Sequence, residues 1–200
     1  MRGFFLAFFL VVACATGTEA GPYEDAFSAL QREDYALAAR LIRPLAEQGD
    51  TNAQNNLARM FANGQGVPLD YRKAVQWYRK AAIQGNAEAQ EALGVMYVQG
   101  RGVQQDAQEA VKWYSRAARR GNAEAQFSLG LMYDSGQGVP QDFIRAHMWY
   151  NVAAAALSDD SEKKATEHRD RVASQMTPAQ IEKAQEMARR CQQSQSKECD

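Results

Sequence analysis

The chain has 200 residues, of which 46% are apolar and 24% charged, and this composition is typical of a folded protein. Lysine and arginine total 23 against 24 acidic residues, so the net charge is −1. A balance so close to zero excludes the broad basic surface by which proteins bind nucleic acid or anionic lipid. We therefore expect no nucleic-acid partner.

The first twenty residues have the pattern of an export signal. Arg2 supplies a positive charge, and residues 4–13 form an apolar run that is too short to span a bilayer. Residues 18–20 (TEA) place small side chains where signal peptidase cleaves. We expect residues 1–20 to be removed as a signal peptide and the rest of the chain to reach the periplasm.

A second processing route is open at Cys14. Residues 11–14 (VVAC) resemble the bacterial lipobox, in which cleavage precedes a cysteine that then carries lipid. Lipidation of Cys14 would tether the protein to the envelope membrane through its acyl chains. We favour the untethered form, because the stretch before Cys14 is short for a lipoprotein and the site after Ala20 competes with it.

Residues 21–48 predict N-terminal capping helices, because they contain half of a unit that is then repeated three times. The complete units are 36 residues long and occupy residues 49–84, 85–120 and 121–156. Each carries a glycine, an aspartate and a tryptophan at the same place: Gly49, Gly85 and Gly121; Asp70, Asp106 and Asp142; Trp77, Trp113 and Trp149. A period of this length is typical of stacked supersecondary units that share one elongated core.

Each unit is predicted to form two helices. In the second unit, Asn86 is the expected N-cap of the first helix, and Asp106 with Glu109 predicts a capping box at the start of the second. The second helix carries rings and alanines on one face, which predicts that neighbouring units interlock there: Ala110, Trp113, Tyr114, Ala117 and Ala118.

Two kinds of glycine recur in the units. Gly100 suits a left-handed helix C-cap and Gly102 keeps the following turn tight, whereas the third glycine and preceding strand of a nucleotide-binding motif are missing. Gly94 lies inside the first helix, where glycine costs about 1 kcal/mol relative to alanine. We expect the close approach of a neighbouring helix to compensate for that cost.

Residues 157–190 predict two C-terminal capping helices, one over about 161–175 and one from a capping box at Thr177 to about Arg190. Residues 191–200 form a polar tail that contains Cys191 and Cys199. Two cysteines in an exported protein suggest a disulfide, which would staple only this tail. The alternative is a frayed tail with two free thiols.

The repeated residues resemble the Sel-one-like (SLR) repeat, a relative of the tetratricopeptide repeat. The pattern of that repeat is A-x-x-x-L-G-x-x-Y-x-x-G-x-G-V-x-x-D-x-x-x-A-x-x-W-x-x-x-A-A. The second and third units match it throughout, whereas the first has Ala58 in place of glycine and Phe61 in place of tyrosine. The resemblance implies an all-α fold, namely a right-handed α-solenoid of antiparallel helix pairs. It also implies a scaffold or adaptor role in protein complexes, commonly in exported bacterial proteins.

Residues that would support catalysis are sparse. His147 and His168 have no metal-ligand spacing, and we expect the first on the surface or in a groove and the second in solvent. Two S-x-x-K sequences, at residues 161–164 and 194–197, lack the other serine β-lactamase motifs. Cysteine-rich SLR relatives described as β-lactamase-like carry a cysteine pair in each repeat, and this chain has none there. We expect no cofactor, metal or catalysis; the competing hypothesis is slow β-lactam hydrolysis through Ser161.

The candidate partner-binding residues are first-helix positions that the repeat pattern leaves free, which should line the concave face. Phe127 and Leu131 lie four residues apart and predict one apolar patch that fits a peptide groove. The alternative is that both pack against the C-terminal capping helices. The two columns of candidates are Asn55, Glu91 and Phe127, and Arg59, Val95 and Leu131.

The sequence therefore predicts a non-catalytic scaffold that binds a protein or peptide in the bacterial cell envelope as a monomer. A periplasmic regulator of a membrane sensor is an alternative, because it would have the same fold and differ only in its partner.

Overall fold

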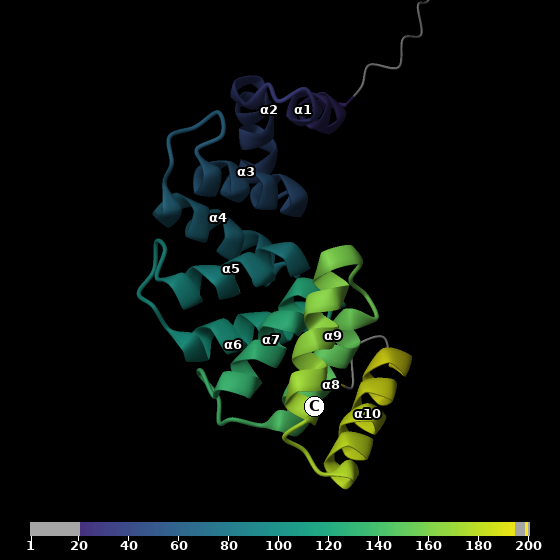
Figure 1. Cartoon of the computed structure of the whole chain (residues 1–200). Coiled ribbons are helices and arrows are strands. Elements are labelled where there is room, and N and C mark those ends of the chain that lie inside the picture. The colour runs from purple at the N-terminus through teal and green to yellow at the C-terminus, as the bar shows by residue number, and fades with distance from the viewer. Residues whose placement is uncertain (1–20, 195–198, 200) are drawn as a thin grey trace, which may run out of the picture.

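A computed structural model describes residues 21–194 and Cys199. The predicted signal peptide and Cys14 lie outside these residues. Within the described part the chain is all-α, with ten helices and no strand (Figure 1). The helices are α1 (Pro22–Gln31), α2 (Tyr35–Glu47), α3 (Thr51–Asn63), α4 (Tyr71–Ile83), α5 (Ala87–Gln99), α6 (Ala107–Ala118), α7 (Ala123–Ser135), α8 (Phe143–Ala154), α9 (Asp159–Ala173) and α10 (Pro178–Gln193).

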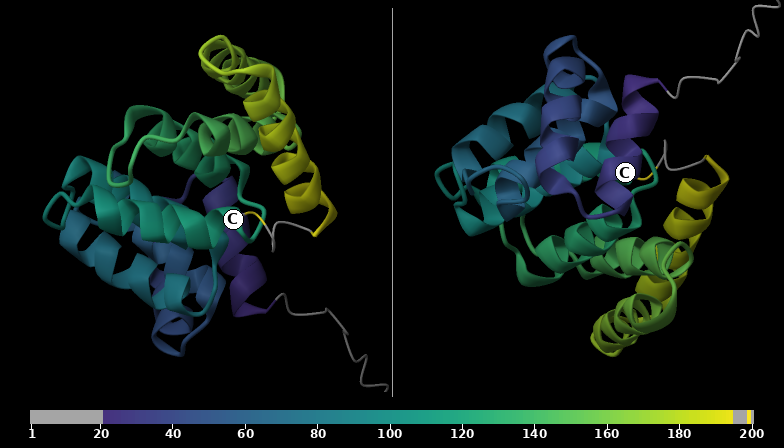
Figure 2. Two further views of the ribbon diagram at one scale, coloured as in Figure 1. Left: turned by 90° about the horizontal axis from the view of Figure 1, so that it is seen from below. Right: turned by 90° about the horizontal axis from the view of Figure 1, so that it is seen from above.

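The helices form a stack in which each one from α1 to α8 packs against the next along the chain, whereas α10 packs back against α8. Figure 1 shows the stack running from α1 and α2 at one end to the last helices at the other, and Figure 2 shows it from its two ends. The three repeated units correspond to the pairs α3–α4, α5–α6 and α7–α8. This arrangement is an α-solenoid, in which each helix pair buries its apolar faces against its neighbours.

Side chains at the helix starts explain where the helices begin. Asn86 caps α5 and Asp106 caps α6, each accepting hydrogen bonds from backbone N–H groups of the first turn. Only half of the capping box predicted for Asp106 and Glu109 is formed, because the Glu109 N–H donates to Asp106 Oδ1 but the Asp106 N–H donates to the Tyr97 carbonyl oxygen. The Glu109 carboxylate accepts from Lys112 Nζ at 2.5 Å instead. The box predicted at Thr177 is present and opens α10.

Aromatic rings and alanines interlock between neighbouring units, as predicted. Trp149 is 2% exposed and belongs to the same buried cluster as Ala117 and Ala118 of the preceding unit. Trp113 is also buried, in the cluster formed by the units before it. Trp77 is only half-buried, and Lys80 Nζ lies 4.0 Å from the centre of its ring. The ladder therefore becomes more buried toward the C-terminal end.

The recurring glycines mark places where the chain approaches itself closely. A Cβ on Gly94 would lie 2.4 Å from Cε1 of Tyr114, so the ring of α6 occupies the space that a side chain on α5 would need. The predicted helix approach at this glycine is therefore confirmed. A Cβ on Gly102, whose φ is +72°, would lie 2.3 Å from the Tyr71 carbonyl oxygen at the start of α4. Gly102 thus allows backbone contact between two units, besides tightening its own turn.

The C-terminal cap consists of α9 and α10, which both pack against α8. Asp134 of α7 links the cap to the last unit: it is buried, accepts a hydrogen bond from the Tyr150 hydroxyl at 3.1 Å, and pairs with Arg171 of α9. His168 of α9 is half-buried, and its ring lies 5.3 Å from that of Tyr150. The expectation that His168 is solvated is therefore wrong, because its helix packs directly over repeat three.

A disulfide joins Cys191 of α10 to Cys199. Both cysteines are buried and belong to the apolar cluster that also contains Ala188. The expectation that the bridge would staple only a polar tail is wrong, because the bridge adds to the core beside α10.

Candidate functional site

The six predicted partner-binding side chains lie on α3, α5 and α7 but differ in exposure. Asn55 is buried, and its amide donates a hydrogen bond to Glu88 Oε2 at 2.9 Å. Arg59 is exposed and donates to the side chain of Asn56, which lies on the same helix. Val95 is half-buried against the apolar core. Asn55 therefore supports the face from below, whereas Arg59 is available to a partner and Val95 is available in part.

Phe127 and Leu131 do not form one open patch. The Phe127 ring is half-buried and packs 5.6 Å from the ring of Tyr150 and 5.4 Å from that of His168 on the cap. Leu131 is 37% exposed and lines a hollow of about 450 Å³ with residues that include Arg171 of α9. The capping helix has therefore covered Phe127, as the alternative stated, and has left Leu131 at the edge of a hollow.

Glu91 carries the largest electrostatic perturbation on this face. It is half-buried on α5, and burial raises the pKa of its carboxyl to about 7, with the negative charges of Glu124 and Glu88 adding to the effect. A cation brought by a partner would lower the pKa of Glu91 again, because it favours the ionised carboxylate. We call Arg59, Glu91, Val95 and Leu131 the first-helix face.

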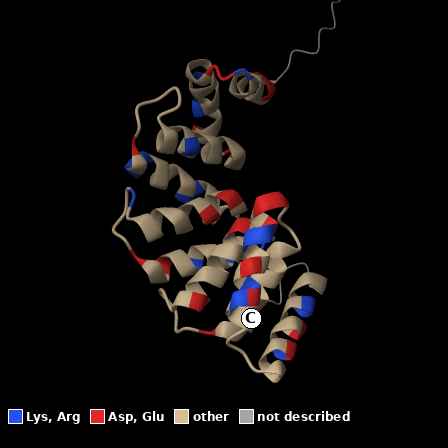
Figure 3. Cartoon of the chain, viewed as in Figure 1, with Lys and Arg blue, Asp and Glu red and all other residues tan. Residues whose placement is uncertain are grey.

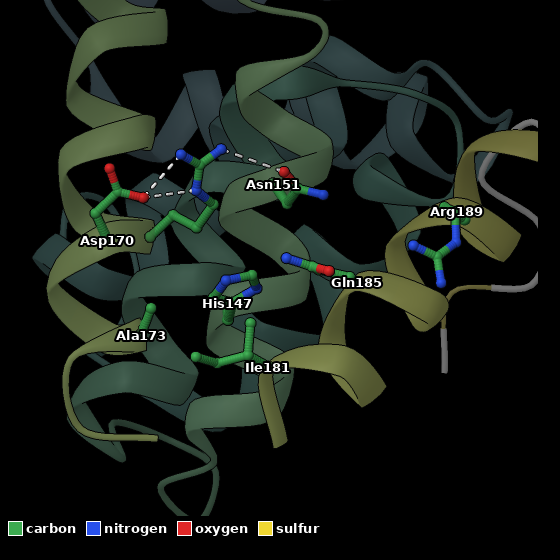
Figure 4. A pocket seen from close by; sticks show the side chains of 8 residues that line it. His147, Asn151, Asp170, Ala173, Ile181, Gln185 and Arg189 are labelled. Atoms are coloured by element: carbon green, nitrogen blue, oxygen red, sulfur yellow. Dashed lines mark hydrogen bonds and ion pairs between the residues drawn. The ribbon is translucent and has the colours of Figure 1, made fainter. Parts of the chain in front are cut away.

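A second concavity lies between α8, α9 and α10. Its volume is about 450 Å³, and Figure 4 shows the imidazole of His147 in the middle of its wall, between Ala173 and Gln185. We call it the His147 pocket. Its lining comprises His147 and Asn151 of α8, Arg169, Asp170 and Ala173 of α9, and Ile181, Gln185 and Arg189 of α10.

Polar groups of the His147 pocket are arranged around Arg169. Arg169 donates to Asp170 Oδ1 from Nε at 2.9 Å and from Nη2 at 2.7 Å, and Nη1 lies 3.4 Å from Asn151 Oδ1. His147 is 3% exposed, and its Nδ1 has no hydrogen-bond partner among the described residues. Burial lowers the pKa of His147, and the positive charge of Arg169 lowers it further, so the imidazole is uncharged at neutral pH.

Sequence reasoning placed His147 in a groove or on the surface but missed the rest of this pocket. The only signal was helical spacing, since His147 and Asn151, and Gln185 and Arg189, lie four residues apart and share a helix face. Nothing in the repeat pattern indicated that α9 and α10 would both pack against α8 and leave a space between them.

The side chains considered for catalysis lie on α8 and α9 in the described part of the chain. No group of three or more histidine, cysteine, aspartate or glutamate side chains there is placed to hold a metal ion. Ser161 is half-buried on α9, and Lys197 of the second S-x-x-K sequence lies outside the described residues. None of the described helices is both long enough and apolar enough to cross a membrane.

The fold and the regular helix pairs define a repeat protein of the α-solenoid class. The Sel1 repeat family matches residues 51–86, 87–122 and 123–156, which together make up more than half of the chain. The chain therefore belongs to the Sel1 repeat family, whose members generally act as scaffolds for protein interactions.

Solved structures of related repeat proteins share this architecture. The protein is similar to c5321, a protective antigen present in uropathogenic Escherichia coli strains that displays an SLR fold, with 34% identity and a TM-score of 0.70 over 82% of this chain. It spans only 33% of the length of c5321. A Sel1 repeat protein from Oxalobacter formigenes is 39% identical, with a TM-score of 0.57, over 63% of this chain and 95% of its own. A search of curated proteins finds no match.

Proposed function

We propose that this protein is a non-catalytic scaffold of the bacterial cell envelope that binds a protein or peptide through its first-helix face. The observation that carries the proposal is the contrast between a constant frame and a variable face. The buried alanines, leucines and rings repeat in every unit, whereas equivalent outward positions hold Arg59, Val95 and Leu131 in turn. The constant residues hold the helices together, so the variable ones are free to determine what binds.

The chemistry of the first-helix face changes along the stack. It offers a cation at Arg59, a carboxyl group with a raised pKa at Glu91 and an exposed aliphatic side chain beside a hollow at Leu131. Figure 3 shows acidic residues on α5, near the middle of the stack. A peptide lying across these helices would meet charge at one end and an apolar anchor at the other, which favours one binding direction.

The envelope location rests on residues 1–20 and has its own test. Metabolic labelling with palmitate, compared between the parent chain and Cys14→Ser, distinguishes the two processing routes. No label in either form agrees with cleavage after Ala20, and label that is lost in Cys14→Ser shows a lipid anchor. A cytoplasmic, unprocessed protein would contradict the envelope assignment.

Binding through the first-helix face is tested by placing a photo-crosslinking amino acid at Leu131 in cells. The matched control is the same substitution at Leu69, which is 57% exposed in the loop before α4. We expect a discrete adduct from position 131 only, and we expect Arg59→Glu to weaken it because that change reverses a charge on the same face. Equal adducts at both positions, or an adduct that Arg59→Glu leaves unchanged, would refute the assignment of this face.

A further inference from the structure

The His147 pocket has a buried hydrogen-bonding group that the protein itself does not satisfy. Nδ1 of His147 has no partner among the described residues, and the side chain is 97% removed from solvent. An unsatisfied buried nitrogen costs about 1–3 kcal/mol, and in native proteins such a group calls for an explanation. A ligand that enters the pocket and completes this hydrogen bond is one such explanation, because the ring lines the cavity (Figure 4).

The other polar groups of the pocket leave mainly donors available. The acceptor oxygen of Asn151 and the carboxylate of Asp170 already bind Arg169. Arg189 uses Nε and Nη2 on Glu186, which leaves Nη1. Within the described residues, the amide nitrogen of Asn151 and the whole amide of Gln185 make no hydrogen bond. A ligand with acceptor atoms can use these donors, and His147 also donates to it in the tautomer that carries the proton on Nδ1.

Charge and shape narrow the class of ligand. Arg169 and Arg189 face Asp170 and Glu186, so the surroundings are close to neutral and suit a single negative charge better than the double charge of a phosphate. Ala173 and Ile181 add an aliphatic wall next to the imidazole. A cavity of about 450 Å³ falls in the ordinary range for small-ligand sites.

We propose that the His147 pocket binds a carboxylate attached to a short aliphatic group, with the amides of Asn151 and Gln185 and the guanidinium of Arg189 as donors. The aliphatic group packs on Ile181. Either a free short-chain acid or the C-terminal carboxylate of a peptide that ends in an aliphatic residue presents this chemistry. The pocket lies on α8, α9 and α10, apart from the first-helix face, so it is a second binding site that does not depend on the proposed scaffold role.

The test follows the side-chain amide resonances of Asn151 and Gln185 by NMR in a buffer without carboxylate. Three probes are titrated into the purified protein: 3-methylbutanoate, a Gly-Gly-Val peptide with a free carboxylate, and the same peptide amidated. We expect saturable shifts with a dissociation constant on the order of 1 mM for a carboxylate probe and none for the amidated peptide. Binding of the free acid alone indicates a small metabolite, and binding of the free peptide alone indicates a peptide terminus.

Gln185→Glu separates this site from non-specific binding. Gln185 is exposed at the pocket rim, so the variant should fold normally, but it replaces a donor by a negative charge and should weaken binding at least about tenfold. Gln108→Glu, an exposed position on α6, adds the same charge far from the pocket as the matched control. Equal binding by both variants, equal binding of the amidated peptide, or shifts produced by inorganic phosphate instead of a carboxylate would overturn the proposal, as would the absence of saturable shifts.

Discussion

Glu91 offers a test of whether the first-helix face is as desolvated as the structure shows. Its pKa is raised from 4.5 to about 7, chiefly by burial, with Glu124 and Glu88 adding like charge. Each pKa unit corresponds to about 1.4 kcal/mol, so the ionised side chain costs about 3 kcal/mol of unfolding free energy. Glu91→Gln keeps the size of the side chain and removes its charge, so it should remove that cost.

The sign of this effect depends on pH. Below the unfolded-state pKa of 4.5, Glu91 is protonated in both states and its ionisation has no influence. Between 4.5 and about 7 the folded state keeps a proton that the unfolded chain has lost, so native stability falls as pH rises. Above about pH 7 both states are ionised and the full cost remains. The gain from Glu91→Gln should therefore grow from near zero at about pH 4 to about 3 kcal/mol at about pH 8.

Urea unfolding followed by circular dichroism, repeated across this pH range, measures the gain. Glu167→Gln, which removes an exposed carboxylate from α9, controls for the change in net charge. A gain that is the same at every pH, or a loss of stability at about pH 8, would show that burial does not govern the ionisation of Glu91.

Three further predictions concern the packing. Gly94→Ala should lower the free energy of unfolding, because overpacking on Tyr114 costs about 1–3 kcal/mol and the gain in helix propensity returns only about 1 kcal/mol. In a Tyr114→Ala background the overpacking is removed, so the same exchange should instead stabilise the protein. Trp149→Ala should cost about 3–5 kcal/mol by chemical denaturation, and Trp77→Ala distinctly less, because only Trp149 is fully buried; equal costs would contradict the graded ladder. Phe127→Glu should lower the melting temperature because it puts a charge between Tyr150 and His168, and an unchanged melting temperature would return Phe127 to the list of free binding residues.

The candidate sites were predictable from the sequence to different extents. The positions of Arg59 and Leu131 follow from the repeat period, because equivalent residues of successive units occupy equivalent places. The burial of Phe127 does not follow, since it depends on how α9 packs over α7 and α8. The His147 pocket was missed for the same reason: its walls come from three helices whose relative angles no repeat specifies.

The sequence by itself determined the helix pairs and their order. A side-chain pattern repeated every 36 residues places each apolar stripe, each capping aspartate and each left-handed glycine in the same local setting three times. Only the tertiary structure decided which glycines allow contact between units and how deeply each tryptophan is buried. It also decided that the C-terminal cap covers Phe127 and leaves a pocket at His147. Local pattern specifies short-range backbone geometry, whereas these features depend on non-repeating helices that meet the array across long sequence separations.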